Sequence, residues 1–129
     1  MGREDVHREM KETLGTVLFS FDWIPDELVD SEWDLVKRLQ FGETLIPHKY
    51  KELIGLAVAA VSRCRYGTLL HAEAARLHGA TEAELAEAVH YAKLVSGWSI
   101  ELNGLQVDQE EFAHQVDGVV AFLRKNGTG

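Results

Sequence analysis

Three side chains that can act as acid, base or nucleophile lie close together in the sequence: Glu52, Cys64 and His71. A carboxylate can orient an imidazole, and an oriented imidazole can accept a proton from a thiol or a substrate. Cys64 and His71 are seven residues apart, so on one helix they would share a face. The positive charges of Arg63 and Arg65 and a nearby helix N-terminus would favour the Cys64 thiolate. We therefore expect a catalytic group of Glu52, Cys64 and His71.

Each of these residues also has a purely structural interpretation. Cys64 could be a small buried hydrophobic residue at a helix junction, and His71 a hydrogen-bonded core histidine. Glu52 could face solvent, since Lys49 and Lys51 are close in sequence. The spacing alone leaves these alternatives open.

We expect no metal and no other cofactor. Histidine and carboxylate ligand types are present, but His71 and His78 are seven residues apart and His90 lies beyond a turn. This spacing does not match the usual zinc-binding patterns, and no HExxH motif occurs.

The spacing of the reactive residues resembles that of a known family. Glu52, Cys64 and His71 fit the motif E-x11-C-x2-C-x3-H, in which Gly67 stands at the second cysteine position. That motif belongs to alkylhydroperoxidase D and its relatives in the carboxymuconolactone decarboxylase family. The similarity covers about residues 45–97, and it depends on ordered spacing across two predicted helices.

The resemblance implies an all-helical fold that assembles into trimers or hexamers. In the peroxidase branch, two cysteines cycle between dithiol and disulfide, and the second attacks peroxide. With Gly67 at that position, Cys64 would be the only redox-active group. The resemblance then implies a one-cysteine thiol peroxidase in which Cys64 forms a sulfenic acid that an external thiol reduces. His71 would accept a proton and Glu52 would orient His71.

A second interpretation comes from the decarboxylase branch, which lacks the cysteine pair and acts by acid–base chemistry on a lactone acid. The chain would then be a non-redox enzyme for a small lactone or carboxylic acid. A ligand-binding oligomer without catalysis is the third possibility. In each case the partners would be a small molecule and further copies of the chain.

The elements that must position these residues are all predicted to be helices. Pro25 and Pro47 each stand where a helix can begin, because proline is well tolerated at the first helical position. After Pro47 the sequence starts polar and becomes apolar on every side, which is typical of a buried helix. The predicted helices cover residues 3–14, 26–41, 48–61, 67–78, 82–96 and 109–125.

Two helix starts carry capping signals, at Thr81 and at Asp108. Gly97, Asn103 and Gly104 predict a loop between the last two helices. On these two helices, the residues expected to face the protein interior are Leu85, Val89, Ala92, Val95, Phe112, Val116, Val119 and Leu123.

The chain as a whole is predicted to be a single all-α domain over residues 1–129. Its motif core is 45–97, with an N-terminal extension at 1–24 and a tail at 126–129. Residues 16–24 are a short apolar run of uncertain type. This run and the aromatic residues exceed what a monomer of this size needs to expose, so we expect a homo-oligomer.

Composition excludes several classes of protein. The formal net charge of −8 argues against sequence-independent nucleic-acid binding and against docking on an anionic membrane. A single cysteine, Cys64, cannot form an intramolecular disulfide. The charged N-terminus lacks the apolar run of a signal peptide. These features predict a cytoplasmic protein.

Overall fold

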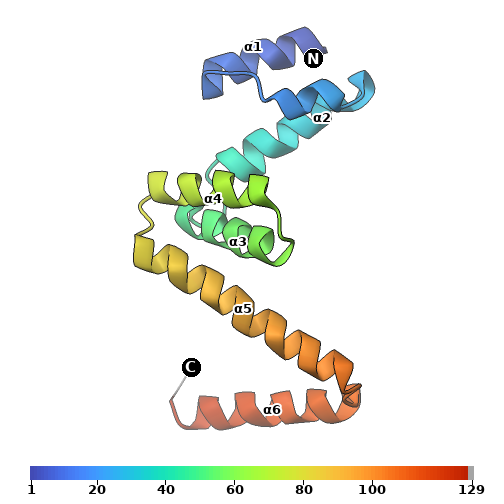
Figure 1. The fold of residues 1–129 in the computed structure, drawn as a ribbon, viewed down its shortest axis with the longest axis vertical. Helices are drawn as coiled ribbons and strands as arrows, with labels where there is room; N and C mark the ends of the chain where they lie inside the picture. The colour runs from blue at the N-terminus through green and yellow to red at the C-terminus, as the bar shows by residue number, and fades with distance from the viewer. Residues whose placement is uncertain (128–129) are drawn as a thin grey trace.

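The computed structural model describes residues 1–127, and every regular element in that range is helical (Figure 1). The all-α prediction is therefore confirmed. The elements, in chain order, are α1 (Arg3–Leu14), the 3-10 helix η1 (Phe19–Trp23), α2 (Asp26–Leu35), the π-helix η2 (Val36–Phe41), α3 (His48–Val61), α4 (Arg65–Leu77), α5 (Glu82–Gly104) and α6 (Gln109–Lys125).

Most helix boundaries agree with the sequence patterns. α1, α3 and α6 have the predicted bounds, and α4 begins two residues earlier than predicted. Gly15 ends α1 in the left-handed conformation, at φ +81°, and its amide donates to the Lys11 carbonyl. The predicted helix 26–41 is helical throughout, but its last six residues are wound as a π-helix. The uncertain run 16–24 contains the 3-10 turn η1.

The predicted loop at residues 97–104 is wrong, because α5 continues through it to Gly104. A glycine inside a helix costs only about 1 kcal/mol relative to alanine, so Gly97 does not end this helix. The Asn103 amide bonds back to the Ser99 carbonyl at 2.7 Å and supports the last turn. The chain reverses later, where Gln106 takes a positive φ of 52°.

The N-terminal segments form a small hydrophobic cluster of their own. Trp33 of α2 is fully buried there, and its ring meets Phe21 edge to face at 6.1 Å between centroids. The indole NH of Trp33 donates to Glu9 of α1 at 3.0 Å. The guanidinium of Arg3 donates to the carbonyls of Phe21 and Ile24. The buried members of this cluster are Val6, Met10, Phe21, Val29 and Trp33.

A second cluster holds together α3, α4 and the start of α5. Its buried residues are Leu56, Ala75, Ala80 and Leu85. Thr81 and Glu84 form the predicted capping box at the first turn of α5. The Lys49 ammonium contacts the Glu84 carboxylate at 2.9 Å and so joins α3 to α5. This second cluster packs together the helices that carry the reactive residues.

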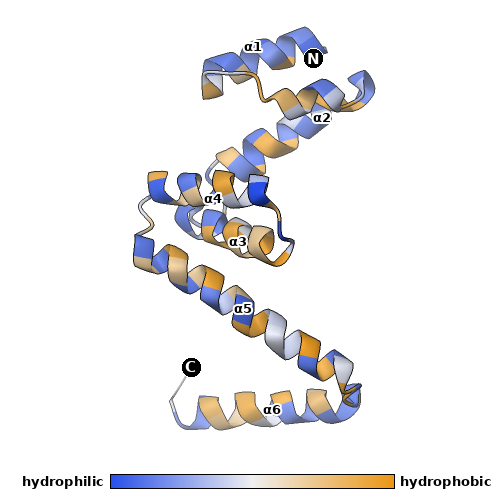
Figure 2. Cartoon of the chain, in the orientation of Figure 1, coloured by the Kyte–Doolittle hydropathy of each residue, from blue (hydrophilic) through white to orange (hydrophobic). Residues whose placement is uncertain are grey.

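The rest of α5 and all of α6 are more exposed than predicted. Of the residues expected to face the interior, only Leu85 and Ala92 are buried. Val89 and Val95 remain 41% and 47% exposed, and α6 has no buried residue. The reason is that α6 lies apart from α1–α4 (Figure 1), so within one chain the hydrophobic residues along it (Figure 2) have little to pack against. None of the described helices is both long and apolar enough to cross a membrane.

Candidate functional site

The α3–α4 hairpin brings the three predicted site residues to one region. Glu52 lies in the first half of α3, Cys64 is the N-cap of α4, and His71 lies in the middle of α4. The short connection is closed by the Cys64 amide, which donates to the Ala59 carbonyl at 2.9 Å. Because the two helices run in opposite directions, residue 52 of the first faces residue 71 of the second.

Glu52 and His71 form a close pair across the two helices. The distance from His71 Nδ1 to Glu52 Oε2 is 2.7 Å, and Glu52 is only 3% exposed. An ionised carboxylate only accepts hydrogen bonds, so Nδ1 of His71 is the donor in this pair. The lone pair of neutral His71 is then on Nε2. This arrangement orients an imidazole base by a carboxylate.

A second histidine, which was not among the predicted site residues, is hydrogen-bonded to the other carboxylate oxygen of Glu52. His48 Nε2 lies 3.1 Å from Glu52 Oε1, and His48 is 6% exposed. The ring of His48 stacks on His78 with centroids 3.8 Å apart and an interplanar angle of 9°. The spacing of His48 and Glu52, four residues apart on one helix, was the available signal.

Gly55 is a further residue of the site that was not predicted from the sequence. A Cβ built on Gly55 would lie 2.5 Å from His71 Nδ1 and 2.7 Å from two ring carbons of the same residue. The imidazole therefore lies directly against the backbone of α3. The sequence signal was a glycine one turn after Glu52, in the apolar part of that helix.

Cys64 takes the place of the usual oxygen-bearing cap of α4. Its Sγ accepts a hydrogen bond from the Gly67 amide at 3.3 Å. The amide and the helix N-terminus stabilise negative charge that develops on the sulfur. Cys64 is half-buried, and so it differs from a fully packed structural cysteine.

Gly67 lies between the thiol and the imidazole. A Cβ at this position would be 3.6 Å from Cys64 Sγ, 3.8 Å from His71 Cδ2 and 3.0 Å from the Ala59 Cβ. Cys64 and His71 therefore face one point of the α4 backbone that carries no side chain. The structure brings Glu52, Cys64 and His71 together in this way, with Gly67 as their common neighbour.

The outer side of Cys64 opens into a surface groove. Arg63 and Arg65 line it beside the thiol, together with Thr68 and Leu69 of α4. Arg76 also lines the groove, and its guanidinium donates hydrogen bonds to Glu73 and Glu82. Glu52 and His71 are not among its lining residues. The groove therefore reaches Cys64, and the Glu52–His71 pair adjoins the thiol through Gly67 without lining the groove.

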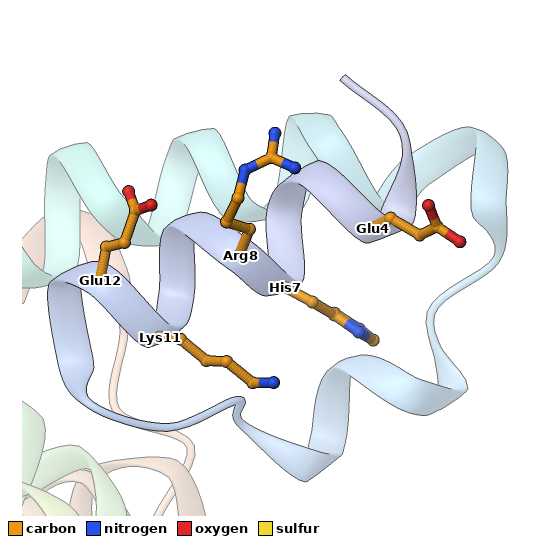
Figure 3. Close-up of a pocket in the computed structure, with 5 residues that line it drawn as sticks. All are labelled: Glu4, His7, Arg8, Lys11 and Glu12. Atoms are coloured by element: carbon orange, nitrogen blue, oxygen red, sulfur yellow. The ribbon is translucent and has the colours of Figure 1, made fainter.

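A separate depression lies on the surface of α1 (Figure 3). Its lining residues are Glu4, His7, Arg8, Lys11 and Glu12. All five project from α1, which belongs to the N-terminal cluster, and none is in the α3–α4 hairpin. Across residues 1–127, no group of three or more His, Cys, Asp or Glu side chains is arranged to hold a metal ion.

Comparisons with known proteins agree with the all-helical fold. The model of the carboxymuconolactone decarboxylase family matches residues 31–110. A crystal structure of the alkylhydroperoxidase AhpD core from Rhodospirillum rubrum is similar in fold, with a TM-score of 0.67. It is 25% identical in sequence, and the match covers 85% of each chain. No curated protein matches the chain.

Proposed function

The chain belongs to the carboxymuconolactone decarboxylase family, and we propose that it is a thiol-dependent peroxidase of the one-cysteine type. Cys64 is the reacting thiol, His71 the proton acceptor and donor, and Glu52 the residue that orients His71. The similarity in fold to the core of an alkylhydroperoxidase supports the class of reaction. The single cysteine of this chain supports the one-cysteine form of it.

One observation carries the proposal: the Cys64 sulfur and the His71 imidazole face the same side-chain-free point at Gly67. The sulfur accepts a hydrogen bond from the Gly67 amide at 3.3 Å. The imidazole is oriented by its hydrogen bond with Glu52, at 2.7 Å. A peroxide that enters the groove would meet a sulfur stabilised as an anion, and the oriented imidazole of His71 lies on the other side of the Gly67 position to exchange the proton. These are the two groups that cleavage of an O–O bond requires.

The reaction balances with these groups alone and one external reductant. His71 takes the thiol proton, and the Cys64 thiolate attacks the terminal peroxide oxygen. The O–O bond breaks, Cys64 becomes a sulfenic acid, and the leaving alkoxide takes the proton from His71 to become an alcohol. One external thiol then condenses with the sulfenic acid and releases water. A second thiol attacks the mixed disulfide, regenerates Cys64 and leaves as the oxidised reductant.

The groove beside Cys64 supports an anionic reductant. Arg63 and Arg65 are both exposed there, and their guanidinium groups attract negative charge. Small anionic thiols are therefore expected to reduce the sulfenic acid faster than cationic thiols of similar size. The preference should weaken as salt is raised, because exposed charges are screened.

The test is consumption of an alkyl hydroperoxide in the presence of a small thiol. Wild-type protein is expected to consume peroxide at least tenfold faster than Cys64→Ser, which keeps the size of the side chain and removes the thiol. Ser62→Ala, in the same turn, is the matched control and should retain the wild-type rate. Equal rates for wild type and Cys64→Ser would refute the peroxidase proposal.

A specific observation favours one other function, an acid–base reaction on a small lactone or carboxylic acid. The Glu52–His71 pair is complete without any cysteine. In that case Cys64→Ser should leave turnover of a lactone acid unchanged, whereas His71→Gln should abolish it. Loss of activity in both variants would point back to the thiol.

A further inference from the structure

Glu52 is enclosed between two imidazoles that come from different helices. Its Oε2 contacts His71 of α4 at 2.7 Å, and its Oε1 contacts His48 of α3 at 3.1 Å. The proposed reaction uses only the His71 side. His48 is nevertheless buried with Glu52, and the proposed reaction gives it no role.

Three side chains surround the imidazole ring of His48. Its ring stacks on His78, which is itself exposed at the end of α4. Its Nδ1 faces the exposed Glu43 carboxylate at 3.9 Å, beyond hydrogen-bond distance. Its Nε2 is thus the nitrogen that bonds to Glu52, and the stack fixes the plane in which that bond lies.

A carboxylate that is ionised only accepts hydrogen bonds. With Glu52 in that form, His48 Nε2 and His71 Nδ1 are both donors to it. A buried carboxylate is costly unless both oxygens have donors. Removal of the His48 donor would leave Oε1 unpaired and free the carboxylate to rotate away from His71.

We propose that His48 is a positioning residue of the site, which acts on His71 through Glu52. By holding Oε1, it keeps Oε2 aimed at His71 Nδ1 and so keeps His71 in the tautomer whose Nε2 is free to accept a proton. The stack on His78 fixes the ring of His48 for this purpose. The inference rests on the proposed function for its kinetic readout, but its structural readout is independent of activity.

The test compares His48→Gln with His48→Asn in the full-length protein. Both variants are polar and neutral, but only glutamine can place an amide nitrogen near the former position of Nε2. The first readout is the 15N spectrum of the His71 side chain, which distinguishes the two neutral tautomers. The second is the pH profile of peroxide consumption. His90→Gln, at an exposed histidine of α5, is the matched control.

We expect His48→Gln and the control to keep His71 protonated on Nδ1 and to retain activity within about threefold of wild type. His48→Asn should show a mixture of His71 tautomers, a displaced pH profile and a tenfold or greater loss of rate. A melting curve shows whether His48→Asn is folded. If this variant is unfolded, His78→Ala takes its place, and we expect it to lose part of the Nδ1–H tautomer of His71.

Identical His71 spectra in His48→Gln, His48→Asn and His78→Ala would overturn the inference, whatever the activity. Absence of peroxide turnover in wild-type protein would instead refute the proposed function. The His71 tautomer can still be read in that case, so the two failures are distinguishable.

Discussion

Gly55 supplies the surface on which the His71 ring rests, and this contact gives a prediction for a single residue. In Gly55→Ala the new methyl group would lie 2.5–2.7 Å from three ring atoms of His71, so the imidazole must move away from Glu52. We expect the unfolding free energy to fall by about 1–3 kcal/mol, as for other overpacked sites, and peroxide turnover to fall at least tenfold.

The control for this change is Gly97→Ala in α5, where an added Cβ meets nothing within 4 Å. An alanine there is expected to stabilise the helix by about 0.4–1 kcal/mol. Chemical denaturation of both variants measures the difference. A Gly55→Ala protein as stable and as active as wild type would contradict the close packing of the His71 ring on Gly55.

Gly67 gives a second prediction for a single residue. A Cβ there would be 3.6 Å from Cys64 Sγ, which is close enough for a disulfide to form after small adjustments. Gly67→Cys should therefore lose two hydrogens on mild oxidation, as measured by intact mass, and Gly67→Ser should not. The Ala59 Cβ at 3.0 Å must move slightly. A Gly67→Cys protein that keeps two free thiols under oxidant would show that the thiol points elsewhere.

Among the helices, ion pairs attach the first turn of α5 to its neighbours. The Lys49 ammonium holds the pKa of the Glu84 carboxyl below its ordinary value, with help from the Thr81 amide. The Arg76 guanidinium does the same to the pKa of Glu82. A carboxyl with a lowered pKa in the folded state stabilises the fold above its unfolded pKa, near 4.5, and this contribution disappears as the pH falls through the folded value.

We therefore expect the melting temperature to fall as the pH is lowered from about 5 toward 3, and to fall less in Glu84→Gln than in wild type. The variant should be somewhat less stable than wild type at pH 7, because it lacks the pair with Lys49 at every pH. Glu87→Gln, on the exposed side of α5, is the control and should follow the wild-type curve. Parallel curves for wild type and Glu84→Gln would exclude this contribution.

The sequence predicted the helices well wherever a capping residue or a proline marked an end, as at Pro47, Thr81 and Asp108. It failed at Gly97 because glycine is a signal for helix ends that tertiary context can override. Glu52, Cys64 and His71 could be found because their spacing carries the family motif. The site roles of His48 and Gly55 could not be predicted, because they depend on how closely α4 approaches α3.

Across the chain as a whole, the second half of α5 and α6 expose a large hydrophobic surface. Phe112, Val116, Val119 and Leu123 lie on one face of α6, and each is 39–52% exposed. Contiguous exposed apolar surface is typical of interaction sites. The sequence pattern predicted that this face is buried, and within one chain it is exposed.

We expect further copies of the chain to cover this face, so size-exclusion chromatography with light scattering should give a mass several times that of the chain. Val119→Glu should shift the protein toward smaller species, because a buried charge at an interface is costly. Glu110→Gln, at the start of α6, is the control and should keep the wild-type mass. A wild-type monomer at micromolar concentration would contradict the expectation of an oligomer.

The central claim is that the Cys64 sulfur attacks peroxide, and trapping of its sulfenic acid tests this most directly. Because Cys64 is the only cysteine, a single dimedone adduct detected by intact mass reports on this residue alone. After brief treatment with an alkyl hydroperoxide, wild-type protein should carry one adduct and form it at least tenfold faster than His71→Gln. A wild-type protein that remains unmodified, or one that reacts no faster than His71→Gln, would contradict the claim.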